Sequence, residues 1–347
     1  MTGTVSVAVR RRRLPAFLSP PVAVCSVATT GLVGYLAVVS PWSVIAGLIP
    51  LVIVLPVLGW LDRIEPEPRS SRTHALLWGA SVAIVVAGVV NTVVGVVAGE
   101  VAAIVVSAPI VEEFAKALGV VWAVRRGEVD GVSDGIVFAG WVALGFAVVE
   151  DMTYFAIADV DGSFVATVIL RAVLTPFAHP LFTFWSGLAI GLAVRKGRRL
   201  RTSMWWGLLL AMGTHAMWNG SLVFADVTYT GDEVVSGLVV LGAITLFVGL
   251  FTAVGVALVV MHRRERARFV AAVPGLVLRH SVSPHEAAWF VDWRTVLVHR
   301  RALPRGERRH FDRLHAVLAR LAAAPEGSER ERQLVAELGE ALTRCRR

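Results

Sequence analysis

The apolar run from Val101 to Val124 contains two adjacent carboxylates, Glu112 and Glu113, followed one helical turn later by Lys116. A run of this length can cross a lipid bilayer. Charged side chains are costly there, so they normally face a bundle interior or a wet cavity and mark a functional site. The sequence therefore predicts a membrane protein built around this one helix.

Composition supports the same class of protein. Of the 347 residues, 56% are hydrophobic and only 17% are charged, whereas soluble domains carry about a quarter charged residues. Apolar runs recur along the chain, and we predict an all-α, polytopic membrane bundle of about eight transmembrane helices with a small helical tail. The predicted spans are 22–40, 43–61, 74–98, 101–124, 134–158, 164–194, 203–225 and 234–260. The two cysteines, Cys25 and Cys345, indicate neither a disulfide framework nor a cysteine metal site.

The loops between these spans alternate in charge. Every second loop is basic. The loops between them hold no lysine or arginine, and their acidic residues are Glu100, Asp159, Asp161, Asp226, Asp232 and Glu233. Because basic loops stay inside, this pattern predicts a multi-pass protein of the cell membrane with both termini in the cytoplasm. The basic loops hold Arg63, Arg69 and Arg72; Arg125 and Arg126; and Arg195, Lys196, Arg198, Arg199 and Arg201.

The predicted organisation has three parts: a basic cytoplasmic N-terminus (1–21), a transmembrane core (22–260) and an arginine-rich tail (261–347). The tail holds 18 arginines and 10 acidic residues, which accounts for the whole net charge of +8. Capping patterns at 283–286 and 328–331, with helical apolar spacing over 311–321, predict a small helical unit. We expect it to bind anionic lipid headgroups or a cytoplasmic protein, and we expect no nucleic-acid partner.

Three further spans carry polar residues at places where lipid would exclude them. The span 134–158 holds Glu150, the span 164–194 holds His179, and the span 203–225 holds His215 and Asn219 one turn apart. At about 1.5 Å per residue, the two histidines and Glu112 fall near the middle of the membrane, and Glu150 falls somewhat outward. The pattern predicts one polar site built from four helices.

Three other polar residues lie within the predicted spans, and we assign none of them to the chemistry of the site. Asp151 and Arg171 lie nearer the outer end of their spans, where water can reach them. Asn91 is isolated in its span, and we interpret it as a helix-packing residue.

The adjacent pair suits acid–base chemistry. Two neighbouring carboxylates in a low dielectric do not both ionise easily, and Lys116 can pair with either, because it is three and four residues away. One carboxylate can then hold a proton while the other is charged.

Four motifs together resemble those of the PrsW family of intramembrane proteases, distantly related to the CAAX prenyl proteases. They are E-E-F-A-K at 112–116, F-A-V-V-E-D-M-T-Y at 146–154, H-P-L-F at 179–182 and H-A-M-W-N at 215–219. The resemblance covers about residues 62–260 and implies cleavage of a membrane-anchored substrate, such as an anti-sigma factor, near the outer face. The positions matching the family motifs are Glu112, Glu113, Glu150, His179 and His215. Asp151 departs from the expected pattern, where asparagine would stand.

Two mechanisms are open from the sequence. In the first, which we favour and which requires no cofactor, Glu113 or Glu112 takes a proton from water while His215 and Asn219 stabilise the oxyanion. In the second, Glu150, His179 and His215 bind Zn²⁺, and a glutamate of the pair is the base. Spacing does not decide between them, because the ligands come from separate helices.

Two other functions are compatible with intramembrane acids, histidines and a lysine. A proton-coupled transporter would use them as a relay. A catalytically inactive scaffold would keep the groove as a binding surface and would tolerate loss of Glu113.

Overall fold

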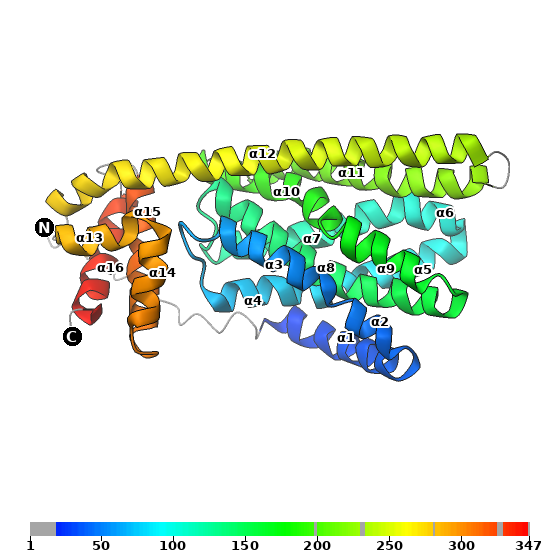
Figure 1. Ribbon diagram of the computed structural model, residues 1–347, viewed down its shortest axis with the longest axis horizontal. Helices are drawn as coiled ribbons and strands as arrows, with labels where there is room; N and C mark the ends of the chain where they lie inside the picture. The colour runs from blue at the N-terminus through cyan, green and yellow to red at the C-terminus, as the bar shows by residue number, and fades with distance from the viewer. Residues whose placement is uncertain (1–18, 198–199, 230–232, 280–281, 325–328, 346–347) are drawn as a thin grey trace, which may run out of the picture.

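The structure is a computed structural model that describes residues 19–197, 200–229, 233–279, 282–324 and 329–345. Within these ranges all regular elements are helical. Figure 1 shows a long bundle with a smaller group of helices, α13 to α16, at one end. We call that end of the bundle the tail end and the opposite end the far end.

The bundle contains helices that correspond to each predicted span. They are α1 (Pro20–Val39), α2 (Pro41–Ala46), α3 (Ile49–Leu61), α4 (Arg69–Leu77), η2 (Trp78–Ala83), α5 (Ile84–Ala98), α6 (Glu100–Ala102), η3 (Ala103–Ser107), α7 (Ala108–Arg125), α8 (Val132–Asp161), α9 (Phe164–Val168), η4 (Ile169–Leu174), α10 (Ala178–Arg195), α11 (Leu200–Tyr229) and α12 (Glu233–Arg279). The all-α membrane bundle is thus confirmed.

Among the described residues, six helical segments are long and apolar enough to cross a membrane. The segments 100–125 and 200–229 are not among them. The first holds the charges of Glu112, Glu113 and Lys116, and the second holds His215 and Asn219. The residues that suggest a site also lower the apolar character of these two helices, and the count of eight spans stays a prediction.

The helix α8 lies at the centre of the bundle, and 83% of its most apolar window is buried. A helix that is apolar on all sides is expected in such a place. It packs closely on α10 through glycines: a Cβ added to Gly187 would overlap the carbonyl oxygen of Gly135. Small residues allow membrane helices to approach in this way.

Three π-helical segments, η2, η3 and η4, interrupt the helices next to α8. After η4 the chain leaves the helix at Thr175 and starts α10 at Ala178, with Pro180 in its first turn. Proline lacks the N–H that would continue the helix through this point. His179 therefore lies in the first turn of α10, directly after a break in the helical backbone.

The helix α12 continues well beyond the predicted span. It runs without interruption for 47 residues, so the predicted boundary after Val260 falls inside it. The change to arginine, alanine and glutamate after this point alters polarity, but these residues are good helix formers. Figure 1 shows α12 lying along both the bundle and the tail.

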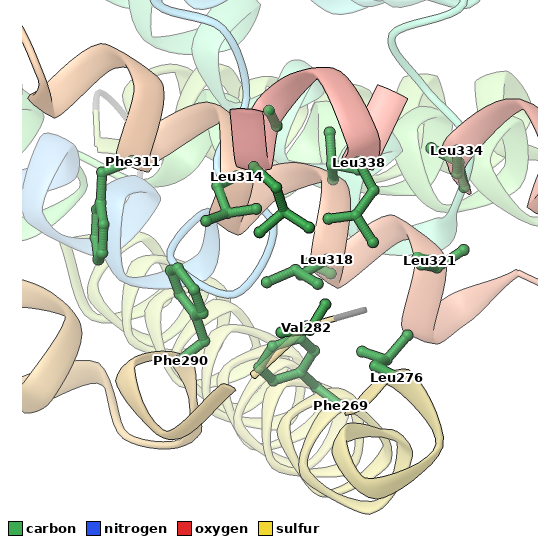
Figure 2. Close-up of a cluster of buried hydrophobic side chains, with 14 residues drawn as sticks. Phe269, Leu276, Val282, Phe290, Phe311, Leu314, Leu318, Leu321, Leu334 and Leu338 are labelled. Atoms are coloured by element: carbon green, nitrogen blue, oxygen red, sulfur yellow. The ribbon is translucent and has the colours of Figure 1, made fainter. Parts of the chain in front are cut away.

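The tail helices are α13 (Pro284–Val291), α14 (Trp293–Ala302), α15 (Arg308–Ala323) and α16 (Glu329–Cys345). Ser283 and Glu286 form the predicted capping box, with Ser283 Oγ accepting from the Glu286 amide at 3.1 Å. The other predicted helix start, at 328, lies outside the described residues. Figure 2 shows the apolar core of the tail, where Phe269 and Leu276 of α12 meet side chains of α15 and α16.

Candidate active site

Lys116 is fully buried at the centre of the polar cluster. Its Nζ donates to Oε1 of Glu113 at 2.9 Å and to Oε2 of Glu112 at 3.3 Å. The same atom lies 3.0 Å from Nδ1 of His179 and 3.8 Å from the ring centroid of Phe146. The ammonium thus has the charge partners and acceptors without which burial of a cation would be prohibitive.

Glu113 is the most constrained carboxylate of the cluster. Its Oε1 bonds both Lys116 and Nδ1 of His215, the latter at 3.2 Å, and its Oε2 accepts from Thr183 Oγ1 at 2.8 Å. The imidazole of His215 also stacks on Phe182, with ring centroids 4.6 Å apart. When Nδ1 of a neutral ring donates to Glu113, Nε2 of His215 carries a lone pair.

His179 is held in a similar way by a second carboxylate. Its Nε2 lies 2.8 Å from Oε2 of Glu150, and Lys116 donates to its Nδ1. Arg171 bonds Glu150 and, through Nε at 2.7 Å, Oδ1 of Asp151. The structure therefore gives a place to Arg171 and Asp151, whose roles the sequence left open. Arg171 bonds both Asp151 and Glu150 and so holds the carboxylate that contacts His179.

Glu112 has looser contacts than its neighbour. Besides Lys116 at 3.3 Å, its Oε1 meets Nδ2 of Asn91 at 3.4 Å. Asn91 in turn accepts from Ser107 Oγ at 2.8 Å. Asn91 is therefore not isolated, because it connects α5 to the carboxylate of Glu112. Of the two adjacent glutamates, Glu112 keeps more bonding capacity for a ligand.

Asn219 lies away from this network. Its Nδ2 donates to the carbonyl oxygen of Ile104 at 2.9 Å, within the π-helical segment η3. Backbone carbonyls in a disturbed helix need such a partner. The position favours a packing role between α11 and η3 over the predicted oxyanion contact.

A metal ion would find a suitable donor set here. Ligand atoms of Glu112, His179 and His215, all buried, lie within 4.8 Å of one another. Two imidazoles and one carboxylate form a known catalytic zinc set, and each imidazole already bonds a carboxylate through its other nitrogen, as metal-bound histidines do. The predicted set had Glu150 in place of Glu112; the structure places Glu150 behind His179, paired with Arg171.

The charges of the cluster are not balanced by the protein. Glu112, Glu113, Glu150 and Asp151 supply four carboxylates. The lysine and arginine that form ion pairs with them are Lys116 and Arg171. If all carboxylates ionise, the excess negative charge favours uptake of protons or of a divalent cation.

Sequence reasoning identified most of this network but missed two participants. Thr183 and Asn91 contact the adjacent glutamates directly. Thr183 lies four residues after His179, so the helical period places both on one face of α10. That spacing could have revealed it. No comparable signal links Asn91 to Glu112, because they lie on different helices.

Buried carboxylates, imidazoles and a lysine within an apolar helical bundle are the residue types expected at the active site of an intramembrane enzyme. Residues 67–250 match the family described as PrsW family intramembrane metalloprotease, and the chain belongs to this family. The matched region holds every residue of the cluster and excludes the whole tail.

A relative supports the assignment. The chain is 31% identical to a protein named Protease PrsW of Geobacillus kaustophilus (strain HTA426) over 181 residues, which cover 51% of this chain and 78% of the relative. No solved structure gives a significant match. The predicted family and the predicted peptidase activity are thus confirmed, and the chain is an intramembrane protease.

Proposed function

We propose that this protease hydrolyses a peptide bond of a membrane-anchored protein at a site formed by Glu112, His179 and His215. The observation that carries the proposal is the convergence of their ligand atoms within 4.8 Å in the buried centre of the bundle. These atoms come from three helices, α7, α10 and α11. The description of the family as metalloproteases favours a metal at this place over the metal-free mechanism that the sequence alone favoured.

Under this proposal, Glu112 and the histidine nitrogens that do not bond Glu113 or Glu150, namely Nε2 of His215 and Nδ1 of His179, would hold the metal. A bound Zn²⁺ would polarise the scissile carbonyl and lower the pKa of its water. Glu113 and Glu150 orient the imidazoles by accepting their other N–H groups. Lys116 stabilises both carboxylates of the adjacent pair and would have to yield its contact with Nδ1 of His179 to such a cation.

The metal-free alternative uses the same residues differently. Glu112, whose contacts are 3.3 and 3.4 Å long, is then a better base for water than Glu113, whose oxygens accept shorter bonds from Lys116, His215 and Thr183. An imidazolium at His215 would donate to the oxyanion through Nε2. Both mechanisms need Glu112. Replacing Glu112 removes bound metal only if the protein uses the metal mechanism.

The substrate class follows from where the site lies. A site enclosed by apolar helices suits a single-span protein whose helix enters the bundle from lipid. We propose such a membrane-anchored substrate, with an anti-sigma-factor-like protein as the type suggested by the family resemblance. The alternation of basic loops supports a multi-pass protein of the cell membrane with cytoplasmic termini.

The test is cleavage of a single-span reporter in reconstituted membranes, with metal content measured on each purified variant. We expect His179→Ala and His215→Ala to lose both metal and cleavage. Loss of a positioned base or ligand costs about 10²–10⁴ in rate. Full activity in protein stripped of all metal would refute the metal site, and full activity of the doubly substituted Glu112→Gln, Glu113→Gln protein would refute the assignment of the site.

The same experiment addresses the two rival functions. A proton-coupled transporter predicts flux that depends on an ion gradient and no cleavage by the wild type. An inactive scaffold predicts unchanged substrate binding and no turnover in any variant. Cleavage by the wild type that vanishes in Glu112→Gln excludes both for this site.

A further inference from the structure

A large cavity lies between the tail end of the bundle and the tail, and no residue of the candidate active site lines it. Its volume is 1980 Å³. The bundle contributes the end of α3 near Trp60, the loop 63–68, the start of α4 and the loop around Asp130. The tail contributes side chains of α14, α15 and α16 and of the loop before α15. Neither part encloses the cavity alone.

The lining is strongly basic. Ten arginines line the cavity against four carboxylates. Two of those carboxylates add little negative charge: Asp312 is bound by both Nε and Nη2 of Arg300, at 2.6 and 2.9 Å, and burial with neighbouring carboxylates raises the pKa of Glu67 to about 10. So many like charges around one space repel one another unless an anion enters.

Three of these arginines form no hydrogen bond or ion pair with the described part of the chain. Within the part of the chain that the structure describes, Arg72 pairs with Asp62 and Arg320 with Glu65, but no hydrogen bond or ion pair involves the side chain of the arginines Arg69, Arg305 and Arg309. The first belongs to the bundle and the other two to the tail. Their guanidinium groups are therefore available from opposite sides of one cavity.

We propose that this cavity binds a multiply charged phosphate-bearing anion, held between Arg69 of the bundle and Arg305 and Arg309 of the tail. The planar guanidinium fork matches phosphate oxygens in a bidentate way, which makes arginine the preferred residue for such ligands. The phosphate can belong to a soluble compound or to a lipid headgroup, because Pro56, Gly59 and Trp60 bring the end of a membrane helix to the lining.

Binding would join the tail to the bundle. One direct ion pair between them, Arg320 with Glu65, spans 3.2 Å. An anion shared by arginines of both parts adds contacts across the same interface, so it stabilises the docked tail by linkage. The proposal does not depend on the proteolytic site, because its readout is binding.

The experiment uses the full-length protein in nanodiscs of neutral phosphatidylcholine, with inorganic triphosphate as the probe. Calorimetric titration gives the affinity, and the thermal unfolding midpoint gives the linked stabilisation. The cavity variant carries Arg69→Gln, Arg305→Gln and Arg309→Gln. The matched control carries Arg263→Gln, Arg264→Gln and Arg268→Gln, which remove the same charge from α12 at exposed positions outside the cavity.

We expect triphosphate to bind wild type and control alike, and the cavity variant to bind it roughly tenfold or more weakly, since charge-assisted contacts to phosphate are lost. Equal affinity in all three proteins, or an equal loss in cavity and control variants, would overturn the proposal. No measurable binding by the wild type would overturn it too.

A second arm separates the two sources of phosphate. Wild type is placed in nanodiscs containing phosphatidylglycerol, and triphosphate is titrated again. If wild type binds triphosphate more weakly in these discs than in neutral ones, and the cavity variant shows no such difference, the occupant is a lipid headgroup. Unchanged binding identifies a soluble anion. Either result supports the site only together with the loss in the cavity variant.

Discussion

Nε2 of His179 lies 2.8 Å from Oε2 of Glu150, and this pairing decides which nitrogen of the imidazole can bond the other groups of the site. With Nε2 committed to the carboxylate, Nδ1 is the atom that faces Lys116 and the rest of the cluster. Glu150 then acts on His179 from behind and does not face the convergent ligand atoms. The two carboxylates Glu112 and Glu150 consequently have different roles, which substitution can separate.

Glu150→Gln and Glu112→Gln should therefore fail in different ways. Removing an orienting carboxylate behind a metal-bound histidine typically costs about 10–100-fold, so we expect Glu150→Gln to retain metal at saturating Zn²⁺ and to cleave slowly. Glu112→Gln should lose metal as well as cleavage. The measurement is zinc content and reporter cleavage of both proteins. Metal loss in Glu150→Gln with full retention in Glu112→Gln would restore the set predicted from sequence.

Arg171 should matter through Glu150. It binds both Glu150 and Asp151, and its removal leaves two neighbouring carboxylates without their cation. Breaking a buried ion pair from one side is strongly destabilising, so Arg171→Gln should lower cleavage about tenfold or more. The double variant Arg171→Gln, Asp151→Asn should recover part of it. Arg195→Gln, at an exposed position, is the control. Wild-type activity of Arg171→Gln would contradict this role.

Glu67 should make stability depend on pH. Burial, with neighbouring carboxylates of Asp134 and Glu65, raises its pKa to about 10 from 4.5. The folded protein keeps a proton that the unfolded chain releases above about pH 4.5, so this residue lowers stability progressively as the pH rises toward 10.

Glu67→Gln removes that proton dependence. We expect it to raise the unfolding temperature more at pH 9 than at pH 5, in thermal unfolding of detergent-solubilised protein. Glu329→Gln, at an exposed position of α16, should give no such difference. An equal gain at both pH values would mean that Glu67 ionises normally.

Truncation should separate the bundle from the tail, and its exact position should matter. Cutting after Arg268 removes all of the tail core that α12 supplies, whereas cutting after Arg279 leaves Phe269 and Leu276 without their partners. We expect the shorter protein to insert and stay monodisperse in detergent, and the longer one to aggregate, because exposed apolar patches associate. Size-exclusion chromatography compares them. Failure of the shorter protein to insert would show that the bundle needs the tail.

Topology can be measured directly. Because lysine and arginine are absent from the predicted outward loops, a reporter fused after Asp161 should read outside the cytoplasm. One fused after Lys196 should read cytoplasmic. The same side for both positions would remove the predicted span between them.

The sequence predicted which residues lie close together better than it predicted which of them bond one another. Glu112, His179 and His215 were placed at one depth by counting 1.5 Å per residue along each span, and the structure gathers them. Depth says nothing of rotation about each helix axis, and the metal set predicted from sequence therefore took Glu150, not Glu112, as its carboxylate. That distinction depends on Arg171, which η4 brings beside α8. A π-helical turn has no clear signature in sequence.

The length of α12 has a mechanical consequence for a membrane protease whose arginine-rich tail lies at one end of its bundle. A rod of 47 residues is about 70 Å long at 1.5 Å per residue. It begins at the far end of the bundle, lies along α11, and supplies Phe269 and Leu276 to the core of the tail. No loop interrupts it, and Pro274 lies inside it near the tail. For a rigid rod of this length, a tilt of about 5° at one end corresponds to a shift of about 6 Å at the other. The same helix contributes Arg266 and Phe269 to the lining of the arginine-lined cavity, so one unbroken element connects the far end of the bundle with that cavity.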